Sequence, residues 1–369
     1  MDTPSSGAAA PRSRGRNFLL GCLAGCGALA LLAVSSCLGL VWWVNRPGEL
    51  LEPSRLRGPE TTAYVEWTLR LEDPGTSAFV DELLASLGRL QRSASSPLPG
   101  ALGGFLANLQ SRRNERQLRE LFPCVVAWGV FGGAEPEDEL HLVTLSVEKL
   151  GNRLVLIDWF LGWVIGRDPE TEVVSHRGEK IYLLKKPGSA FFLRSGQIFF
   201  TTGLEAATRA VDRLQPEAAG PPEATELDRL IEGLPADRPL RGATTNQHGE
   251  IGRLVSLLLD PPAEEVPGTV WDQVRGATLA GGFAEDSSFV AALDLRTEGP
   301  LWSGEEARAM AESLAASLST ESLPVRVEAL PQADGVRFEF EVDDLPRLLE
   351  RWTARVVERA RERSDRPAQ

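Results

Sequence analysis

Cysteine and histidine are scarce in this chain of 369 residues. Three of the four cysteines lie within one N-terminal apolar run, so the remainder of the chain, which holds Cys124 alone, predicts no internal disulfide. The three histidines are far apart, at positions 141, 176 and 248, and no HExxH, CxxC or other paired spacing of metal ligands occurs. The sequence therefore predicts no metal and no other cofactor. Cys124, in the apolar stretch LFPCVVAWGVF, is expected to be a small buried hydrophobic residue.

Sequence signatures of catalysis are also missing. The chain has no GxSxG nucleophile elbow, no GxxxxGK[ST] phosphate-binding loop and no GxGxxG that opens a helix. Its net charge is −13, which disfavours nucleic acids and anionic lipid surfaces as partners. We therefore expect no nucleic-acid partner, and we assign no catalytic, cofactor-binding or metal-binding residue.

The longest apolar run extends from Phe18 to Val44, 27 residues without a charged side chain. As a helix it would be about 40 Å long at ~1.5 Å per residue, more than the ~30 Å of the hydrocarbon core of a bilayer. Arginines precede the run, and Trp42 and Trp43 end it, a pattern that places the N-terminus in the cytoplasm and the tryptophans at the lipid–water interface. We predict a disordered cytoplasmic N-terminus over 1–17, a single-pass helix in the cytoplasmic membrane, and all later residues outside.

A lipoprotein signal is the alternative. A cleaved secretory signal has an apolar region of ~7–15 residues, which is shorter than this run. LAGC and VSSC, which end at Cys26 and Cys37, both resemble the ends of bacterial lipoprotein signals. Cys37 follows the longer apolar stretch, but the apolar LGLVWWV comes after it, where a mature lipoprotein usually continues with polar residues. Acylation at Cys37 therefore remains open beside the retained helix.

Gly21 and Gly25 form a GxxxG motif within the predicted span. Such a motif lets two membrane helices approach closely, which implies a weak homodimer. The alternative is that both glycines only fill the span.

The rest of the chain reads as two α+β units with mainly antiparallel sheets covered by helices. A proline-rich tether over 45–60 leads into the first unit, 61–214. A linker with a short helix, 215–237, separates it from the second unit, 238–361, and a polar tail covers 362–369. Both units show the same order of strand, helices, strand pair, helix, strand pair and closing helix, and the first adds one hairpin. This order predicts an internal duplication, with chance agreement of the element order as the alternative.

Two helix starts carry the spacing of a capping box, Thr202 with Glu205 and Ser303 with Glu306. Alternating apolar and charged residues in GVRFEFEV predict a strand with one dry and one wet face.

The segment LVLIDWFLGWVI is a predicted helix of unusual apolarity, in which Asp158 is the one charged residue. Twelve residues are too short to cross a bilayer, so the first interpretation is a helix buried against strands through Leu154, Ile157, Leu161 and Val164.

The second interpretation of this helix is an exposed apolar surface formed by Trp159, Phe160 and Trp163, which would bind a partner protein, a lipid or the face of the membrane.

Few polar residues are candidates for a functional site. RGATTNQHGE holds His248 and Glu250, a pair that suits acid–base chemistry, but the same residues suit a strand end that caps the next helix. Asp158 within its apolar helix suits a carboxyl group of raised pKa, or a residue that faces solvent or pairs with an arginine.

The segments GEKIYLL, FFLRSGQIFFTTGLEAATRAVDRL and WDQVRGATLAGGF, together with the N-terminal anchor, resemble in layout a bacterial family of membrane-anchored extracytoplasmic proteins of unknown function. The resemblance implies the same membrane placement, and it implies no activity and no catalytic residues.

We expect a membrane-anchored extracytoplasmic protein that binds or scaffolds without catalysis, through its bilayer anchor and an unidentified envelope protein or apolar ligand. One alternative is a carrier or sensor of an apolar ligand, which a large apolar pocket would favour. The other is a hydrolase built on Asp158 or His248.

Overall fold

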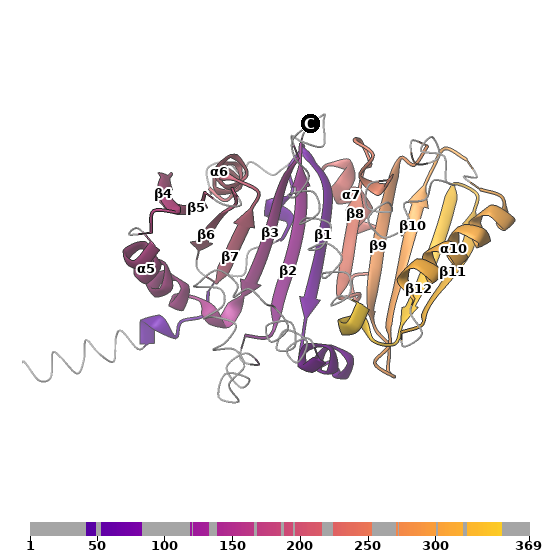
Figure 1. Cartoon of the computed structure of the whole chain (residues 1–369), viewed down its shortest axis with the longest axis horizontal. Coiled ribbons are helices and arrows are strands. Elements are labelled where there is room, and N and C mark those ends of the chain that lie inside the picture. The colour runs from indigo at the N-terminus through magenta and orange to yellow at the C-terminus, as the bar shows by residue number, and fades with distance from the viewer. Residues whose placement is uncertain are drawn as a thin grey trace, which may run out of the picture. The chain divides into compact units, whose positions relative to one another are not determined.

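The computed structural model describes most of the chain that follows the predicted span (Figure 1). The described residues are 42–48, 53–82, 119, 121–132, 139–165, 168–185, 188–194, 196–215, 224–252, 271, 273–299, 302–319 and 323–348.

The chain divides into two compact units, Met1–Arg46 and Pro47–Gln369. In the first unit the described residues form a short helical turn over 42–44, and the guanidinium carbon of Arg46 lies 5.7 Å from the ring centroid of Trp42. The rest of the predicted span, with Gly21, Gly25 and Cys37, lies outside the described residues, as does the tail over 362–369. Within the described part, no helix has the length and hydropathy needed to cross a membrane.

The second unit is built on one sheet of 12 strands, all of them antiparallel to their neighbours, with helices on both faces, so the α+β prediction is confirmed at this level. The order of strands across the sheet is β11-β12-β10-β9-β8-β1-β2-β3-β7-β6-β5-β4. The strands are β1 (Thr61–Leu69), β2 (Cys124–Phe131), β3 (Leu140–Val147), β4 (Thr171–His176), β5 (Glu179–Leu184), β6 (Ala190–Arg194), β7 (Gln197–Thr201), β8 (Leu240–Thr244), β9 (Gly276–Phe283), β10 (Phe289–Arg296), β11 (Val325–Gln332) and β12 (Gly335–Val342). The helices with fully described bounds are η1 (Pro53–Leu56), η3 (Glu148–Leu150), α5 (Arg153–Ile165), α6 (Leu204–Arg213), α7 (Glu226–Glu232) and α10 (Gly304–Leu318).

The two halves of the sheet use their strands in the same order. The first half runs β1-β2-β3-β7-β6 from the centre outward, and the second runs β8-β9-β10-β12-β11. The hairpin of β4 and β5, which follows α5, adds two further strands at the edge of the first half only. By this order α5 and α10 occupy matching places, because each is the first α-helix after the third strand of its half.

The two predicted units share this one sheet. Strands β1 and β8 pair across the predicted boundary, with Glu66 opposite Arg241. The Arg241 guanidinium forms an ion pair with the Glu66 carboxylate, whose side chain is only 7% exposed, and the Tyr64 hydroxyl donates a 3.4 Å hydrogen bond to the same carboxylate. The halves are therefore joined by backbone pairing and by a nearly buried ion pair.

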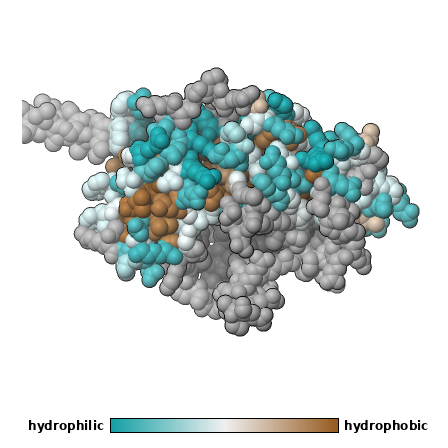
Figure 2. Space-filling view, turned by 90° about the horizontal axis from the view of Figure 1, so that it is seen from above, coloured by the Kyte–Doolittle hydropathy of each residue, from teal (hydrophilic) through white to brown (hydrophobic). Residues whose placement is uncertain are grey.

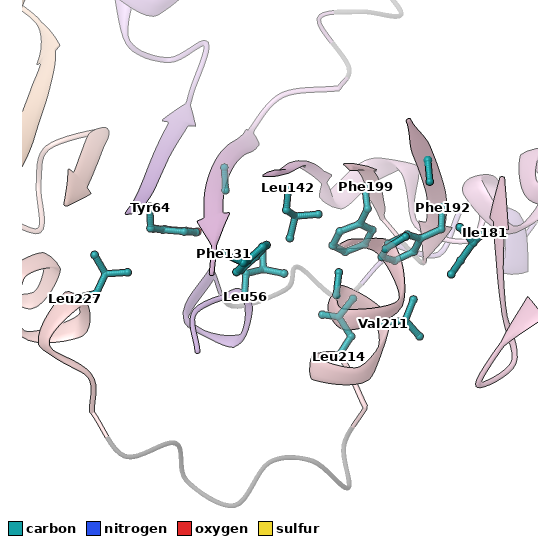
Figure 3. Packing of buried hydrophobic residues seen from close by; sticks show 14 of the residues in the cluster. Leu56, Tyr64, Phe131, Leu142, Ile181, Phe192, Phe199, Val211, Leu214 and Leu227 are labelled. Atoms are coloured by element: carbon teal, nitrogen blue, oxygen red, sulfur yellow. The ribbon is translucent and has the colours of Figure 1, made fainter. Parts of the chain in front are cut away.

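The faces of the sheet follow from the register, because directly opposed residues in antiparallel strands point to the same side and successive residues alternate. We call the side that carries Tyr64, Leu142 and Phe199 the α6 face, since these residues pack with Ala207 and Val211 of α6 in one core cluster (Figure 3). We call the other side the α5 face. In the second half the α5 face is covered by α10, whose buried residues are Ala307, Met310, Ala311 and Leu314.

Strand β12 shows why the alternation predicted its two faces. Val336 and Phe338 are each 1% exposed and pack under α10. Arg337, between them, points to the other face and pairs with Asp294 of β10 at 2.6 Å. The period-two pattern of GVRFEFEV is thus confirmed.

The two predicted capping boxes differ in outcome. At α10, the Ser303 hydroxyl accepts a hydrogen bond from the backbone N–H of Glu306, and the Glu306 carboxylate accepts one from the backbone N–H of Ser303, so this box is confirmed. The box at Thr202 is wrong, because α6 begins after Gly203 without a side-chain cap. The Thr202 hydroxyl instead accepts a 3.0 Å hydrogen bond from the backbone N–H of His141.

Candidate apolar interaction surface

Helix α5 forms where the apolar segment predicted it, but it packs on the sheet with its most polar side. The Asp158 carboxylate accepts hydrogen bonds from the Tyr182 hydroxyl at 2.7 Å and from the Lys180 ammonium at 3.2 Å, both on β5. Gly162, one turn later, lies over the same two side chains, and a Cβ there would come within 3.4 Å of Lys180 Nζ. Leu154, one turn earlier, is 2% exposed. The inward stripe of α5 is thus a leucine, an aspartate and a glycine spaced by four residues.

The outward side of α5 is made of large apolar side chains. Trp159 is 70% exposed, Phe160 53% and Trp163 56%, and the rings of Phe160 and Trp163 lie 6.3 Å apart. We call the exposed large apolar residues of this helix the α5 surface. Its members are Val155, Leu156, Ile157, Trp159, Phe160 and Trp163.

The sequence interpretation of α5 as a buried core helix is corrected by these exposures. Ile157, expected in the core, is 42% exposed, and Leu161 is half-buried, whereas Leu154 is buried as expected. The Val164 side chain lies outside the described residues. The reason is that a helix with apolar residues all around has no preferred inward side, so the hydrogen bonds of Asp158 to β5 set its rotation.

Apolar residues continue from beneath α5 onto the α5 face of the sheet. Tyr182 is fully buried and stacks on Phe191 at 4.9 Å, and Phe191 lies 6.2 Å from Phe200 on the next strand. Phe200 is 47% exposed, and Val143, opposite it on β3, is 38% exposed. Figure 2 shows a continuous brown area at the end of the molecule that carries α5 in Figure 1. The apolar surface therefore extends beyond the helix itself.

Helix α10 offers an internal comparison, because it holds the same place in the other half. Its outward residues include Glu305, Arg308 and Glu312, all exposed, while Ala307, Met310, Ala311 and Leu314 are buried against the sheet. A helix at this place can therefore be apolar inside and polar outside. The reversed pattern of α5 is a property of its sequence and not a requirement of the fold.

Electrostatics beneath α5 are those of a half-buried network. Burial, together with the hydrogen bond and negative charge of Asp158, raises the pKa of Tyr182 well above its ordinary value. Burial also raises the pKa of Glu179, against the nearby Arg194, and Asp158 adds to the rise. Asp158 therefore acts as the acceptor that attaches α5 to β5.

The second unit begins beside the start of α5. The backbone N–H of Gly48 donates a 2.9 Å hydrogen bond to the carbonyl of Glu148 in η3. A Cβ at Gly48 would come within 2.9 Å of Gly151 Cα and 3.0 Å of Gly196 Cα, so the backbone passes there at a distance that only glycine permits. Gly151 precedes the first residue of α5 by two positions.

The candidates His248 and Glu250 lie in the turn after β8, where the polar groups serve the backbone. The Asn246 side chain accepts a hydrogen bond from the Ile251 backbone at 2.9 Å and donates one to the Val274 carbonyl at 2.7 Å. The Glu250 carboxylate accepts from the His248 backbone at 3.1 Å. These bonds fit the interpretation as a helix cap, and they do not bring the His248 ring together with Asp158.

A cavity of about 550 Å³ opens on the α6 face of the second half, away from α5. Its floor carries Asp294 bonded to Arg337 and Arg326 bonded to Glu341, with Glu339 beside them. Neither Asp158 nor His248 lines it. Its lining mixes these charged side chains with apolar ones such as Leu234, Val290 and Phe340, whereas a site for an apolar ligand is lined predominantly by apolar side chains.

Within the described part of the chain, no group of three or more His, Cys, Asp or Glu side chains is arranged to hold a metal ion.

The sequence interpretation missed part of the apolar surface, namely Val155, Leu156 and Ile157 on α5 and Val143 and Phe200 on the sheet. Two signals point to them in retrospect. Asp158, as the one polar group of the segment, seeks hydrogen-bond partners, which turns the neighbouring apolar residues outward. Strand β7 (QIFFT) has phenylalanines at two successive positions, so one of them must face each side of the sheet.

Comparisons with models of protein families, with curated proteins and with solved structures found no match to this chain.

Proposed function

We propose that this chain is a membrane-anchored extracytoplasmic protein of the bacterial envelope that binds or scaffolds without catalysis, and that the α5 surface is the part that binds. The observation that carries the proposal is the reversed packing of α5, with Asp158 toward the sheet and Trp159, Phe160 and Trp163 toward the outside. Large contiguous apolar patches on the exposed surface of a folded domain usually mark an interaction site.

The comparison with α10 supports a binding role for the α5 surface, because the fold itself does not require exposed apolar residues at this place. Two helices at the same place in the fold differ in what they expose, and only the one in the first half presents aromatic rings. Aromatic side chains dominate the energetics of interaction surfaces because they bury a large area with few rotatable bonds.

Membrane anchoring through Phe18–Val44 is supported by the length of the run, by the arginines before it and by Trp42 and Trp43 at its end. We propose an N-terminus in the cytoplasm and the second unit outside. Acylation at Cys37 is the alternative attachment, and a weak homodimer through Gly21 and Gly25 is compatible with the first form only.

The other two functions have less support. A carrier of an apolar ligand would need an enclosed apolar pocket, and the cavity on the α6 face is open and has charged residues as well as apolar ones in its lining. A hydrolase would need Asp158 or His248 beside a further titratable group in a cleft, whereas the described bonds of Asp158 attach a helix.

We also infer that the two halves arose by duplication of one α+β unit. The matching order of β1-β2-β3-β7-β6 and β8-β9-β10-β12-β11 supports this, as does the matching place of α5 and α10. Superposing the backbones of these strands in a crystal structure of the second unit should align all five pairs in the same direction. Strands that align only in part, or in reverse, would contradict a duplication.

The binding proposal can be tested by photo-crosslinking in intact cells that express the full chain. A photoreactive amino acid at position 160, in place of Phe160, should give adducts with an envelope component. The same amino acid at the exposed Glu312 of α10 is the matched control and should give none. Equal adducts from both positions, or none from position 160, would contradict the α5 surface as a binding site.

An alkaline wash of the membranes from the same cells tests the anchor. The full chain should stay with the lipid fraction, because a transmembrane helix is not removed by raised pH. Release of the chain into the wash would contradict membrane anchoring in either form.

A further inference from the structure

We infer that the partner of the α5 surface is the lipid–water interface of the membrane that holds the anchor, so that the second unit lies against its own bilayer. This inference rests on the anchor in the proposed function. It goes further because it names what covers Trp159, Phe160 and Trp163.

The length of the connecting chain is the first argument. The predicted span ends at Val44, and Gly48 is already bonded to the carbonyl of Glu148. Four residues reach at most about 14 Å. Gly48 also lies against Gly151, two residues before α5 begins. The apolar helix therefore starts close to the point where the chain must leave the membrane.

The shape and chemistry of the α5 surface are the second argument. Interfacial helices lie in the plane of the membrane with their apolar side in the boundary between headgroups and acyl chains. Helix α5 has 13 residues, which is about 20 Å at ~1.5 Å per residue. The indole rings of Trp159 and Trp163 suit this boundary, because their N–H groups stay near water while the rings leave it. The one charged residue between Leu154 and Ile165 faces the sheet and would not enter the lipid.

The charges near α5 indicate whether electrostatic attraction or apolar transfer would hold the α5 surface at the membrane. The described charged residues that flank the helix are of both signs, four positive and three negative, so their net charge of +1 gives little attraction to anionic headgroups. They are Glu148, Lys149, Arg153, Asp168, Glu170, Lys180 and Lys185. Binding must therefore come mainly from transfer of apolar side chains, which salt does not screen as it screens the attraction between charges. Even a weak affinity suffices, because a short tether gives the surface an effective concentration on the order of millimolar at the membrane.

Spin labels on the full chain in nanodiscs of zwitterionic phosphatidylcholine test the inference. The four native cysteines are replaced by alanine, and one cysteine is introduced in place of Phe160, on the α5 surface. Leu330→Cys, at an exposed position of β11 in the other half, is the matched control. Trp42→Cys, at the end of the predicted span, reports on the anchor. Each label is measured for collision with oxygen, which concentrates in lipid, and with a nickel chelate, which stays in water.

We expect the ratio of oxygen to nickel collisions to be clearly higher at position 160 than at position 330, and unchanged between low and high salt. A ratio at 160 equal to that at 330, with a lipid-like ratio at position 42, would overturn this inference and leave the anchor standing. Water-like ratios at both 42 and 160 would overturn the anchor as well. Spin–spin broadening at position 160 that disappears on dilution with unlabelled chain would also overturn the inference, because a second copy would then cover the α5 surface.

A second reporter guards against an effect of the substitution itself. Ile157→Cys places the label on the same surface without removing an aromatic ring. Its collision ratio should also exceed that at position 330. A water-like ratio at 157 beside a lipid-like ratio at 160 would contradict an α5 helix that lies flat in the interface.

Discussion

The replacement Trp159→Ser tests whether the ring of Trp159 belongs to a binding surface or to the core. About 70% of this residue is exposed, so at most the remaining ~30% is buried. A tryptophan side chain covers up to ~250 Å², and ~30% of that at ~25 cal/mol per Å² is an upper bound of about 2 kcal/mol. Serine keeps part of this contact and has a similar helix propensity to tryptophan. We therefore expect a loss in the free energy of unfolding below about 1 kcal/mol.

The matched variant is Leu154→Ala on the inward side of the same helix. Leu154 is 2% exposed, and truncation of a buried leucine costs about 2–5 kcal/mol through lost transfer energy and the cavity left behind. Leu161→Ala, at a half-buried position, should fall between the two.

Urea denaturation of the fragment 47–369, followed by far-ultraviolet circular dichroism, measures all three variants without relying on tryptophan fluorescence. The fragment contains every strand of the sheet. If Trp159→Ser lowers the unfolding midpoint as much as Leu154→Ala does, the ring is a core element and the argument for the α5 surface is refuted.

Three further predictions concern the buried polar groups. The chain has two tyrosines, Tyr64 and Tyr182, and burial raises the pKa of each above its ordinary value of ~10, so the tyrosines of the unfolded state ionise at lower pH. The free energy of unfolding should therefore keep their full contribution below pH ~10 and fall as the pH rises above it. Absorbance at 295 nm should show phenolate only as the fold is lost. Burial raises the pKa of Cys124 to about 12, so in the fragment 47–369 this thiol should react with a disulfide reagent at pH 8 only after denaturant is added, and a reaction in the native state would show that it is not buried. Arg241→Ala should cost about 3–5 kcal/mol because it leaves the carboxylate of Glu66 buried without its partner, and thermal unfolding of the double variant with Glu66→Gln should recover most of this loss.

Structural features that depend on residues close along the chain were predictable from the sequence. The alternation in GVRFEFEV indicated β12, and the spacing of Ser303 and Glu306 indicated the start of α10, because both signals depend on residues close along the chain. The capping box predicted from the spacing of Thr202 and Glu205 was wrong because a contact distant along the chain takes its place. Thr202 bonds to the backbone of His141, which is 61 residues earlier and adjacent only in the sheet.

The arrangement of the two halves needed the tertiary structure. Repeated element order indicated two similar units, but the pairing of Glu66 with Arg241 joins strands 175 residues apart. No local pattern records which edge strands meet, because hydrogen bonding along an edge is open to any strand of matching length and register.

Helix α5 shows most clearly what the sequence determines and what only the tertiary structure decides. Its sequence determined that a helix forms at 153–165 and that its side chains are apolar on every side but one. It did not determine which side faces the sheet, since an apolar residue is buried equally well at any angle. That choice came from Tyr182 and Lys180 on β5, which are 24 and 22 residues from Asp158 along the chain and donate hydrogen bonds to its carboxylate. It leaves Trp159, Phe160 and Trp163 outside, because a half-buried carboxylate without hydrogen-bond donors costs more free energy than an exposed indole ring.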